Sequence, residues 1–117
     1  MFSGIIQKIG TIKSISSKNE IKTFIIEEKE LSPTQKIGAS VSVDGACLTI
    51  ISKNDNDFTV EAIPETLERT ISGNYIVGQK VNLEASLKIG DSLDGHFVSG
   101  HIDFKSSIIK MEKNDKF

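Results

Sequence analysis

Short stretches in which apolar and polar residues alternate dominate the chain, and helical stripes of apolar residues are scarce. The strand candidates are residues 9–13, 23–27, 58–62 and 81–84. Turn-forming residues separate these stretches at 17–19, 32–33, 53–57, 72–74 and 77–78. With a hairpin at 40–50, the pattern predicts about six short strands in residues 1–87. It favours a closed antiparallel barrel, because closure removes unpaired strand edges.

One segment, residues 64–70, carries the signals of a helix. Its sequence, Pro-Glu-Thr-Leu-Glu-Arg-Thr, puts Pro64 at an early position and Glu65 in the first turn, where the helix dipole favours an acid. The pattern therefore predicts an all-β fold with a six-stranded antiparallel barrel and one short helix.

Residues 40–50 form the most informative segment, because Asp44-Gly45 between alternating residues predicts a two-residue hairpin turn. This turn fixes the register, in which Val43 faces Ala46, Ser42 faces Cys47, Val41 faces Leu48 and Ser40 faces Thr49. One face of the hairpin then carries Val41, Val43, Ala46, Leu48 and Ile50, and the other carries Ser40, Ser42, Cys47 and Thr49.

The polar face of this hairpin has two interpretations. It is either the solvent-exposed face of a half-buried hairpin, or a wall that hydrogen-bonds a flat polar ligand. The alternation of residues does not decide between them. Cys47 also has a structural interpretation, because a free cysteine often serves as a small buried apolar residue.

The end of the chain contains an internal similarity to its beginning. A shift of 96 residues aligns Ser99-Gly100-His101-Ile102 with Ser3-Gly4-Ile5-Ile6, and both segments are expected to begin a strand. The pattern predicts a complete module at residues 1–87. It also predicts a linker and the first strand of an incomplete second module at residues 88–117.

Composition excludes several classes of function. Fourteen basic residues are balanced by 16 acidic ones, with one Tyr and no Trp, so a nucleic-acid-binding barrel is disfavoured. Cys47 is the only cysteine and cannot form an internal disulfide.

His96 and His101 would point to opposite faces of a strand, so no metal site is expected. No apolar run approaches a membrane span and no leader is evident, so we expect no membrane association and a cytoplasmic protein.

Five blocks of the chain, in order and at matching spacing, resemble riboflavin synthases. They are Met-Phe-Ser-Gly-Ile-Ile at 1–6, Gly-Ala-Ser-Val-Ser-Val-Asp-Gly-Ala-Cys-Leu-Thr-Ile at 38–50, Glu-Thr-Leu at 65–67, Gly-Gln-Lys-Val-Asn-Leu-Glu at 78–84 and Gly-His-Phe-Val-Ser-Gly-His-Ile-Asp at 95–103. The resemblance implies two Greek-key barrels in a full-length chain and a homotrimer, with each site between barrels of neighbouring subunits. It implies a dismutation of two 6,7-dimethyl-8-ribityllumazine molecules to riboflavin and 5-amino-6-(D-ribitylamino)uracil, without a cofactor.

The resemblance also assigns site residues by position. Substrate contacts fall on Gly4, Ile5, Ile6, Cys47, Leu48, Thr49, Glu61, Ala62, Ile63, Pro64, Glu65, Thr66, Gly100, His101 and Ile102. Ser40, Cys47 and His101 are the catalytic candidates. Histidine carries protons near neutral pH, and a thiol or hydroxyl can attack or position water. The resemblance thus favours the ligand-wall interpretation of the hairpin.

The main alternative is a non-catalytic lumazine- or flavin-binding protein of the same superfamily. The resemblance favours the enzyme, because such carriers lack the cysteine and the Gly-His-Ile block that this chain has at Cys47 and at 100–102. Without a second barrel, we expect these 117 residues to bind ligand without turnover. We also expect a homodimer, because the apolar face meant for a sister barrel would be exposed.

Overall fold

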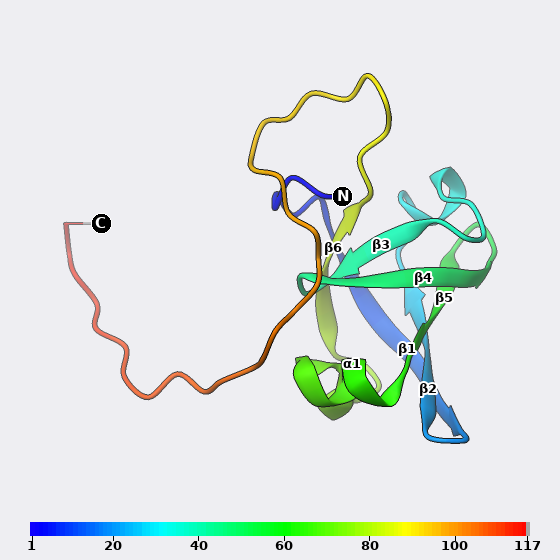
Figure 1. The fold of residues 1–117 in the computed structure, drawn as a ribbon, viewed down its shortest axis with the longest axis horizontal. Coiled ribbons are helices and arrows are strands. Elements are labelled where there is room, and N and C mark those ends of the chain that lie inside the picture. The colour runs from blue at the N-terminus through cyan, green and yellow to red at the C-terminus, as the bar shows by residue number, and fades with distance from the viewer. Residues whose placement is uncertain (117) are drawn as a thin grey trace.

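The computed structural model describes residues 1–116, in which six antiparallel strands close into a barrel (Figure 1). The strands are β1 (Lys8–Lys18), β2 (Ile21–Glu27), β3 (Ser40–Val43), β4 (Ala46–Lys53), β5 (Asp57–Ala62) and β6 (Lys80–Ala85). Around the barrel their order is β1-β2-β5-β4-β3-β6. The helix α1 (Pro64–Arg69) and two 3₁₀ helices, η1 (Ser32–Thr34) and η2 (Ile71–Asn74), lie in the connections. The predicted fold class, a six-stranded antiparallel barrel with one short helix, is confirmed.

The β3–β4 hairpin has the predicted register. Ser40 pairs with Thr49, Val41 with Leu48, Ser42 with Cys47 and Val43 with Ala46. Asp44 and Gly45 have φ of 50° and 86°, as a turn with two left-handed residues requires. The apolar face points into the barrel, so the opposite face with Ser42 and Cys47 lies on the outer side.

The β1–β2 hairpin is longer than the sequence predicts. β1 continues five residues beyond the predicted 9–13 strand, and the turn falls on Asn19 and Glu20, both with positive φ, rather than on 17–19. Residues 14–18 remain in the strand because they pair residue by residue with β2, from Ser14 opposite Ile25 to Lys18 opposite Ile21. Strand pairing here outweighs a sequence that favours a turn.

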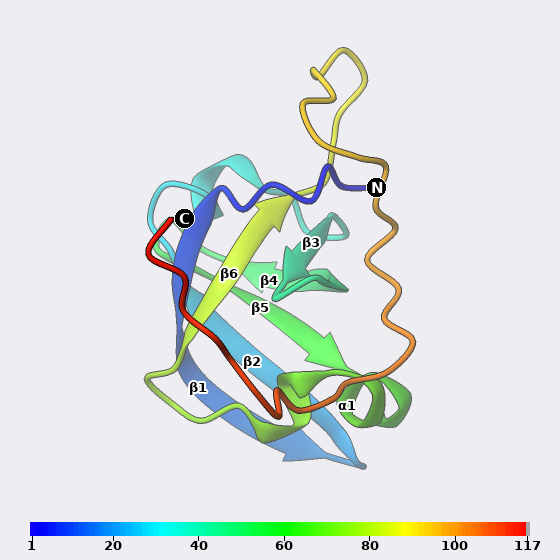
Figure 2. The same ribbon diagram turned by 90° about the vertical axis from the view of Figure 1, so that its left-hand side faces the viewer.

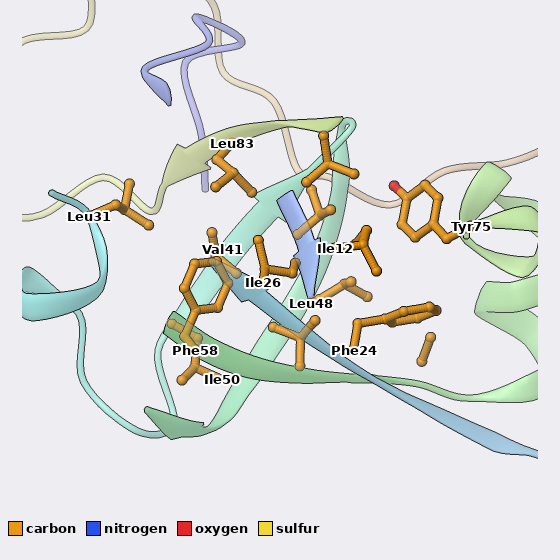
Figure 3. Close-up of a cluster of buried hydrophobic side chains, with 14 residues drawn as sticks. Ile12, Phe24, Ile26, Leu31, Val41, Leu48, Ile50, Phe58, Tyr75 and Leu83 are labelled. Atoms are coloured by element: carbon orange, nitrogen blue, oxygen red, sulfur yellow. The ribbon is translucent and has the colours of Figure 1, made fainter. Parts of the chain in front are cut away.

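The barrel interior is filled by apolar side chains from every strand (Figure 3). Phe24, Phe58 and Ile50 are at most 1% exposed. At the end of the barrel near α1, the ring of Tyr75 packs edge-on against Phe24, with ring centroids 5.4 Å apart. Burial of this apolar surface is the main source of stability, and it leaves the outer faces of the strands free for other contacts.

Asp44 joins the hairpin tip to two other parts of the barrel end. Its carboxylate accepts hydrogen bonds from the Tyr75 hydroxyl at 2.6 Å and from the Asn82 amide at 2.8 Å. The Asp44 amide in turn donates to the Asn82 carbonyl at 2.8 Å. Tyr75 directly follows η2, so this network fixes the helical connection relative to the hairpin.

After β6 the chain makes a wide loop and returns to its own beginning (Figures 1 and 2). Phe2 and Val98 form an isolated antiparallel bridge, with N–H to O distances of 2.8 and 2.9 Å in the two directions. Residues 86–116 contain no strand, so the strand expected through His96 and His101 is absent. The reason is that the backbone partners of this segment are few and scattered, on Phe2, Ser3 and Cys47, and that the chain turns at Gly100, with φ of 82°. The start of a second module in 88–117 stays a prediction.

The two segments that the 96-residue shift aligns share local geometry. Gly4 and Gly100 have φ of 85° and 82°. The hydroxyl of Ser3 accepts from the Ile5 amide at 3.3 Å, and the hydroxyl of Ser99 accepts from the His101 amide at 3.1 Å. Phe2 and Val98, which pair with each other, are also 96 positions apart. These observations agree with an internal repeat, which itself stays a prediction.

We predict that Tyr75→Phe lowers the free energy of unfolding by about 1.5–3 kcal/mol, the usual contribution of a hydrogen bond to a charged group. The ring and its contact with Phe24 remain, so the loss reports the bond to Asp44 alone. Chemical denaturation monitored by circular dichroism measures it. A change below about 0.5 kcal/mol would show that the bond contributes nothing net.

The same pair predicts a pH dependence. Burial, together with the hydrogen bond to Asp44, raises the pKa of Tyr75 above its ordinary value of about 10. In the unfolded chain the phenol ionises near pH 10 while the folded chain keeps it neutral, so its stabilisation is present below that pH and is lost as pH rises. The difference in unfolding free energy between wild type and Tyr75→Phe therefore shrinks between about pH 8 and about pH 11. A constant difference would contradict the assignment.

Candidate functional site

A cavity of about 290 Å³ opens on the outer side of the barrel, between the start of β4, helix α1 and residues 100–102. It is lined by Ala46, Cys47, Ile63, Glu65, Thr66, Arg69, Thr70, Gly100, His101 and Ile102. We call it the hairpin–helix cavity. Its volume is close to the lower limit of about 300 Å³ for small-molecule sites.

Cys47 reaches this cavity because of the alternation along β4. Its neighbours Ala46 and Leu48 are buried, whereas Cys47 is half-buried on the outer side. Its amide donates to the Gly100 carbonyl at 2.8 Å, which ties the strand to the C-terminal segment. The hairpin register therefore places the single thiol of the chain in the cavity wall.

Helix α1 forms the second wall directly after β5. Thr70, at the end of the helix, is buried; its hydroxyl donates to the Thr66 carbonyl at 2.7 Å and accepts from the Ser72 amide at 3.2 Å. Glu65 and Arg69, one turn apart, form an ion pair at 3.3 Å. The wall thus offers a hydroxyl, a carboxylate and a guanidinium close together.

Residues 100–102 form the third wall and run past the hairpin toward α1 (Figure 2). A Cβ on Gly100 would lie 2.8 Å from Cys47 Cβ and 3.1 Å from both the Cys47 amide nitrogen and a ring carbon of Phe2. Only glycine allows this approach, and only glycine adopts its φ of 82° without strain. The approach carries His101 and Ile102 to the cavity edge.

The three walls together combine apolar surface with polar groups. Ala46, Ile63 and Ile102 provide apolar surface, while Thr66, Glu65, Arg69 and His101 provide hydrogen-bond donors and acceptors. Cys47 adds a nucleophile and His101 adds a group that can carry a proton. Within residues 1–116, no three His, Cys, Asp or Glu side chains gather as metal ligands. No helix in that range is long and apolar enough to cross a membrane.

A second cavity, of about 390 Å³, lies beside β6 and residues 2–6. Its lining includes Phe2, Gly4, Ile6 and Val98, together with Ser42 and Glu84. The Glu84 carboxylate is already occupied by hydrogen bonds within the chain. This cavity has no cysteine or histidine in its lining, and so we take the hairpin–helix cavity as the candidate site.

The structure brings together about half of the site residues predicted from the sequence. Cys47, Ile63, Glu65, Thr66, Gly100, His101 and Ile102 line the hairpin–helix cavity, whereas Gly4 and Ile6 line the second cavity. Leu48 and Ala62 have side chains in the barrel core, and Ser40, Thr49, Glu61, Pro64 and Ile5 line neither cavity. Of the catalytic candidates, Cys47 and His101 share one cavity and Ser40 does not.

Sequence reasoning missed three residues of the cavity wall. Ala46, Arg69 and Thr70 line it without having been predicted. A signal for Arg69 was present, because Glu65 and Arg69 are four apart on the predicted helix and must share a face. Nothing in the sequence pattern indicates that the same face meets residues 100–102.

The fold and the cavity define a small antiparallel β-barrel domain with a candidate ligand site beside its β3–β4 hairpin. The family model described as the lumazine binding domain matches residues 3–86. The chain therefore belongs to the lumazine-binding domain family.

Relatives with curated names support this membership. The chain is similar to the riboflavin synthases of Bacillus amyloliquefaciens, at 37% identity over 113 residues, and of Chlamydia pneumoniae, at 40% over 115 residues. Both alignments cover 97% of this chain, but 53% and 58% of the respective relatives. The chain thus spans about half the length of the curated relatives that it matches.

Solved structures with the same fold carry ligands. The chain is similar to LumP complexed with riboflavin, with a TM-score of 0.80 at 28% identity, covering 89% of this chain and 56% of that one. It is also similar to LumP complexed with 6,7-dimethyl-8-(1'-D-ribityl) lumazine, with a TM-score of 0.78 at 28% identity, covering 89% and 58%. The ligands belong to LumP.

We predict that Gly100→Ala detaches residues 96–102 from the barrel, because the added methyl collides with Cys47 and the backbone becomes strained. Hydrogen exchange of the Cys47 amide, which Gly100 protects, should accelerate by at least about tenfold. Gly90→Ala is the matched control, because Gly90 has φ of 95° but open space around it. Equal exchange rates in both variants would show that the close approach is unimportant.

Proposed function

We propose that this chain is the N-terminal, ligand-binding part of a riboflavin synthase and that its hairpin–helix cavity binds 6,7-dimethyl-8-ribityllumazine and riboflavin. The observation that carries the proposal is the meeting of Cys47, Thr66 and His101 in one cavity, from three separate parts of the chain. The names of the relatives and the ligands of LumP support the choice of substrate class.

The proposed reaction joins two lumazine molecules, one of which transfers a four-carbon unit to the other. The donor must lose a proton from its C7 methyl group, and the acceptor must be attacked at a ring carbon. In this proposal His101 carries the proton, and Cys47 attacks or positions the attacking water. Ser40, which does not line the cavity, is proposed as an auxiliary hydroxyl on the neighbouring strand. Much of the acceleration comes from holding two substrates in register.

The second candidate function is a non-catalytic lumazine- or flavin-binding protein. The similarity to ligand-bound LumP over 89% of this chain favours it. The two functions share the same cavity and differ in turnover. Cys47 and His101 favour the enzyme, because a carrier needs neither a nucleophile nor a proton carrier at its ligand.

We predict that the purified 117-residue chain binds riboflavin or the lumazine, seen as a quenched or shifted ligand fluorescence, without appreciable turnover. The reaction needs two ligands side by side, and residues 1–116 offer a single cavity that has both Cys47 and His101 in its wall. Failure to bind either ligand at high micromolar concentration would count against the cavity. Robust riboflavin formation from the lumazine would refute the need for a second barrel.

A matched pair of variants locates the binding. Thr66→Val removes a hydroxyl from the cavity wall and should weaken riboflavin binding about fivefold, as loss of one hydrogen bond does. Thr59→Val, on β5, removes an equally half-buried hydroxyl that does not line the cavity, and should leave the affinity unchanged. Fluorescence titration of both variants measures this. Equal losses would place the ligand elsewhere.

We further propose that the chain associates into a homodimer, and that a full-length chain forms a homotrimer. Ile5, Ile6 and Phe97 are about half to three-quarters exposed and lie on the paired N- and C-terminal segments. Ile108 and Ile109 are almost fully exposed. Apolar surface of this kind tends to find a partner, and a twofold interface uses one patch twice.

Light scattering at several concentrations tests the association, and a dimer mass is expected. Phe97→Glu should shift the equilibrium toward monomer by inserting a charge into the patch. Ile76→Glu is the control, because Ile76 is similarly exposed but outside the paired segments. A monomer mass of the wild type at all concentrations would show that the exposed surface is tolerated.

A cytoplasmic location of the protein stays a prediction.

A further inference from the structure

Glu84 is the last residue of the 78–84 block singled out in the sequence, and the proposed function assigns it no role. It lies on β6 and is 4% exposed. Its carboxylate accepts three hydrogen bonds: from the Ser3 amide at 2.7 Å, the Ser3 hydroxyl at 2.8 Å and the Gly4 amide at 3.0 Å. No lysine, arginine or histidine among residues 1–116 forms an ion pair with it.

A buried carboxylate without a basic partner depends on its hydrogen-bond donors. All three donors here belong to the N-terminal segment, residues 1–4. Release of that segment would leave the carboxylate without them, so Glu84 strongly favours the docked position. The segment in turn buries Phe2, which is 1% exposed.

The docked N-terminal segment provides the surface on which residues 96–102 lie. Phe2 and Val98 exchange two backbone hydrogen bonds, and the His96 amide donates to the Ser3 carbonyl at 2.8 Å. Two residues after Val98, the Gly100 carbonyl accepts a hydrogen bond from the Cys47 amide. Residues 96–100 thus have backbone partners in the N-terminal segment and in β4.

We propose that Glu84 is a positioning residue that holds residues 96–102 against the barrel through the N-terminal segment. It thereby places His101 and Ile102 in the wall of the hairpin–helix cavity, although its own side chain does not line that cavity. The consequence for ligands rests on the proposed function. The positioning of residues 96–102 does not, and it can be tested without ligand.

Glu84→Gln keeps the size of the side chain but replaces one acceptor oxygen with an NH₂ group. This group is a hydrogen-bond donor and would face the N–H or O–H donors of Gly4 or Ser3, so at least one of the hydrogen bonds is lost. Undocking of the N-terminal segment should become about tenfold more frequent. We expect hydrogen exchange of the Phe2 and Val98 amides, and alkylation of the single cysteine, Cys47, to accelerate by this factor.

Asp57→Asn is the matched control, because Asp57 is 7% exposed and pairs with Lys13, away from the N-terminal segment. It should leave the exchange of Phe2 and Val98 and the alkylation of Cys47 unchanged. Circular dichroism confirms that each variant is folded. If Glu84→Gln does not fold, Ser3→Ala, which removes one donor, should give an acceleration of about threefold.

Two results would overturn the proposal. The first is that Glu84→Gln shows the same exchange and alkylation rates as the wild type. If Glu84→Gln does not fold, the same result for Ser3→Ala counts in its place. The other is an equal acceleration by Asp57→Asn, which would show a general loosening of the barrel.

For the ligand, riboflavin affinity should fall about tenfold in Glu84→Gln and stay constant in Asp57→Asn. If the wild type does not bind riboflavin, the proposed function fails, while the exchange and alkylation results still decide the role of Glu84.

Discussion

Strand β6 hydrogen-bonds to β1 on one side and to β3 on the other, and this double pairing closes the barrel. The first strand and the third are thereby held at fixed positions relative to a strand from the end of the domain. Inside, Leu83 of β6 is fully buried in the core. On the outer side, Glu84 holds the N-terminal segment. A single six-residue strand therefore connects the core, the hairpin and the chain terminus.

Closure also explains why the candidate site lies outside the barrel. The interior is filled by aromatic and branched side chains, so it leaves no room for a ligand. The strands alternate, and each inward residue leaves a neighbour facing outward. At the β3–β4 hairpin that neighbour is Cys47, beside which α1 and residues 100–102 stand as walls. The core thus holds the strands in fixed positions, and the outer face carries the side chains that line the candidate site.

The fold class and the β3–β4 hairpin were predictable from local patterns. The Asp44-Gly45 turn fixed the hairpin register, since both positions need a left-handed backbone, and alternation of residues then decided which side chains face inward. The length of β1 was not predictable, because Ser17 and Lys18 belong to a turn-forming stretch and stay extended only through pairing with β2. The order of strands around the barrel also depends on contacts between distant segments.

The barrel class, the hairpin, the short helix and the family could be inferred from the amino-acid sequence alone, because periodicity, turn residues and motif spacing are local properties. The sequence also indicated Cys47, Thr66 and His101 as candidates. Which of these candidates meet became visible in the folded chain: Cys47, Thr66 and His101 share one cavity, Ser40 and Thr49 lie outside it, and Gly4 and Ile6 line a different cavity. The tertiary structure also revealed Arg69 and Glu84. These meetings depend on long-range hydrogen bonds, in which the Ser3 amide donates to Glu84 and the Cys47 amide donates to the Gly100 carbonyl, and which join segments about 50 to 80 residues apart.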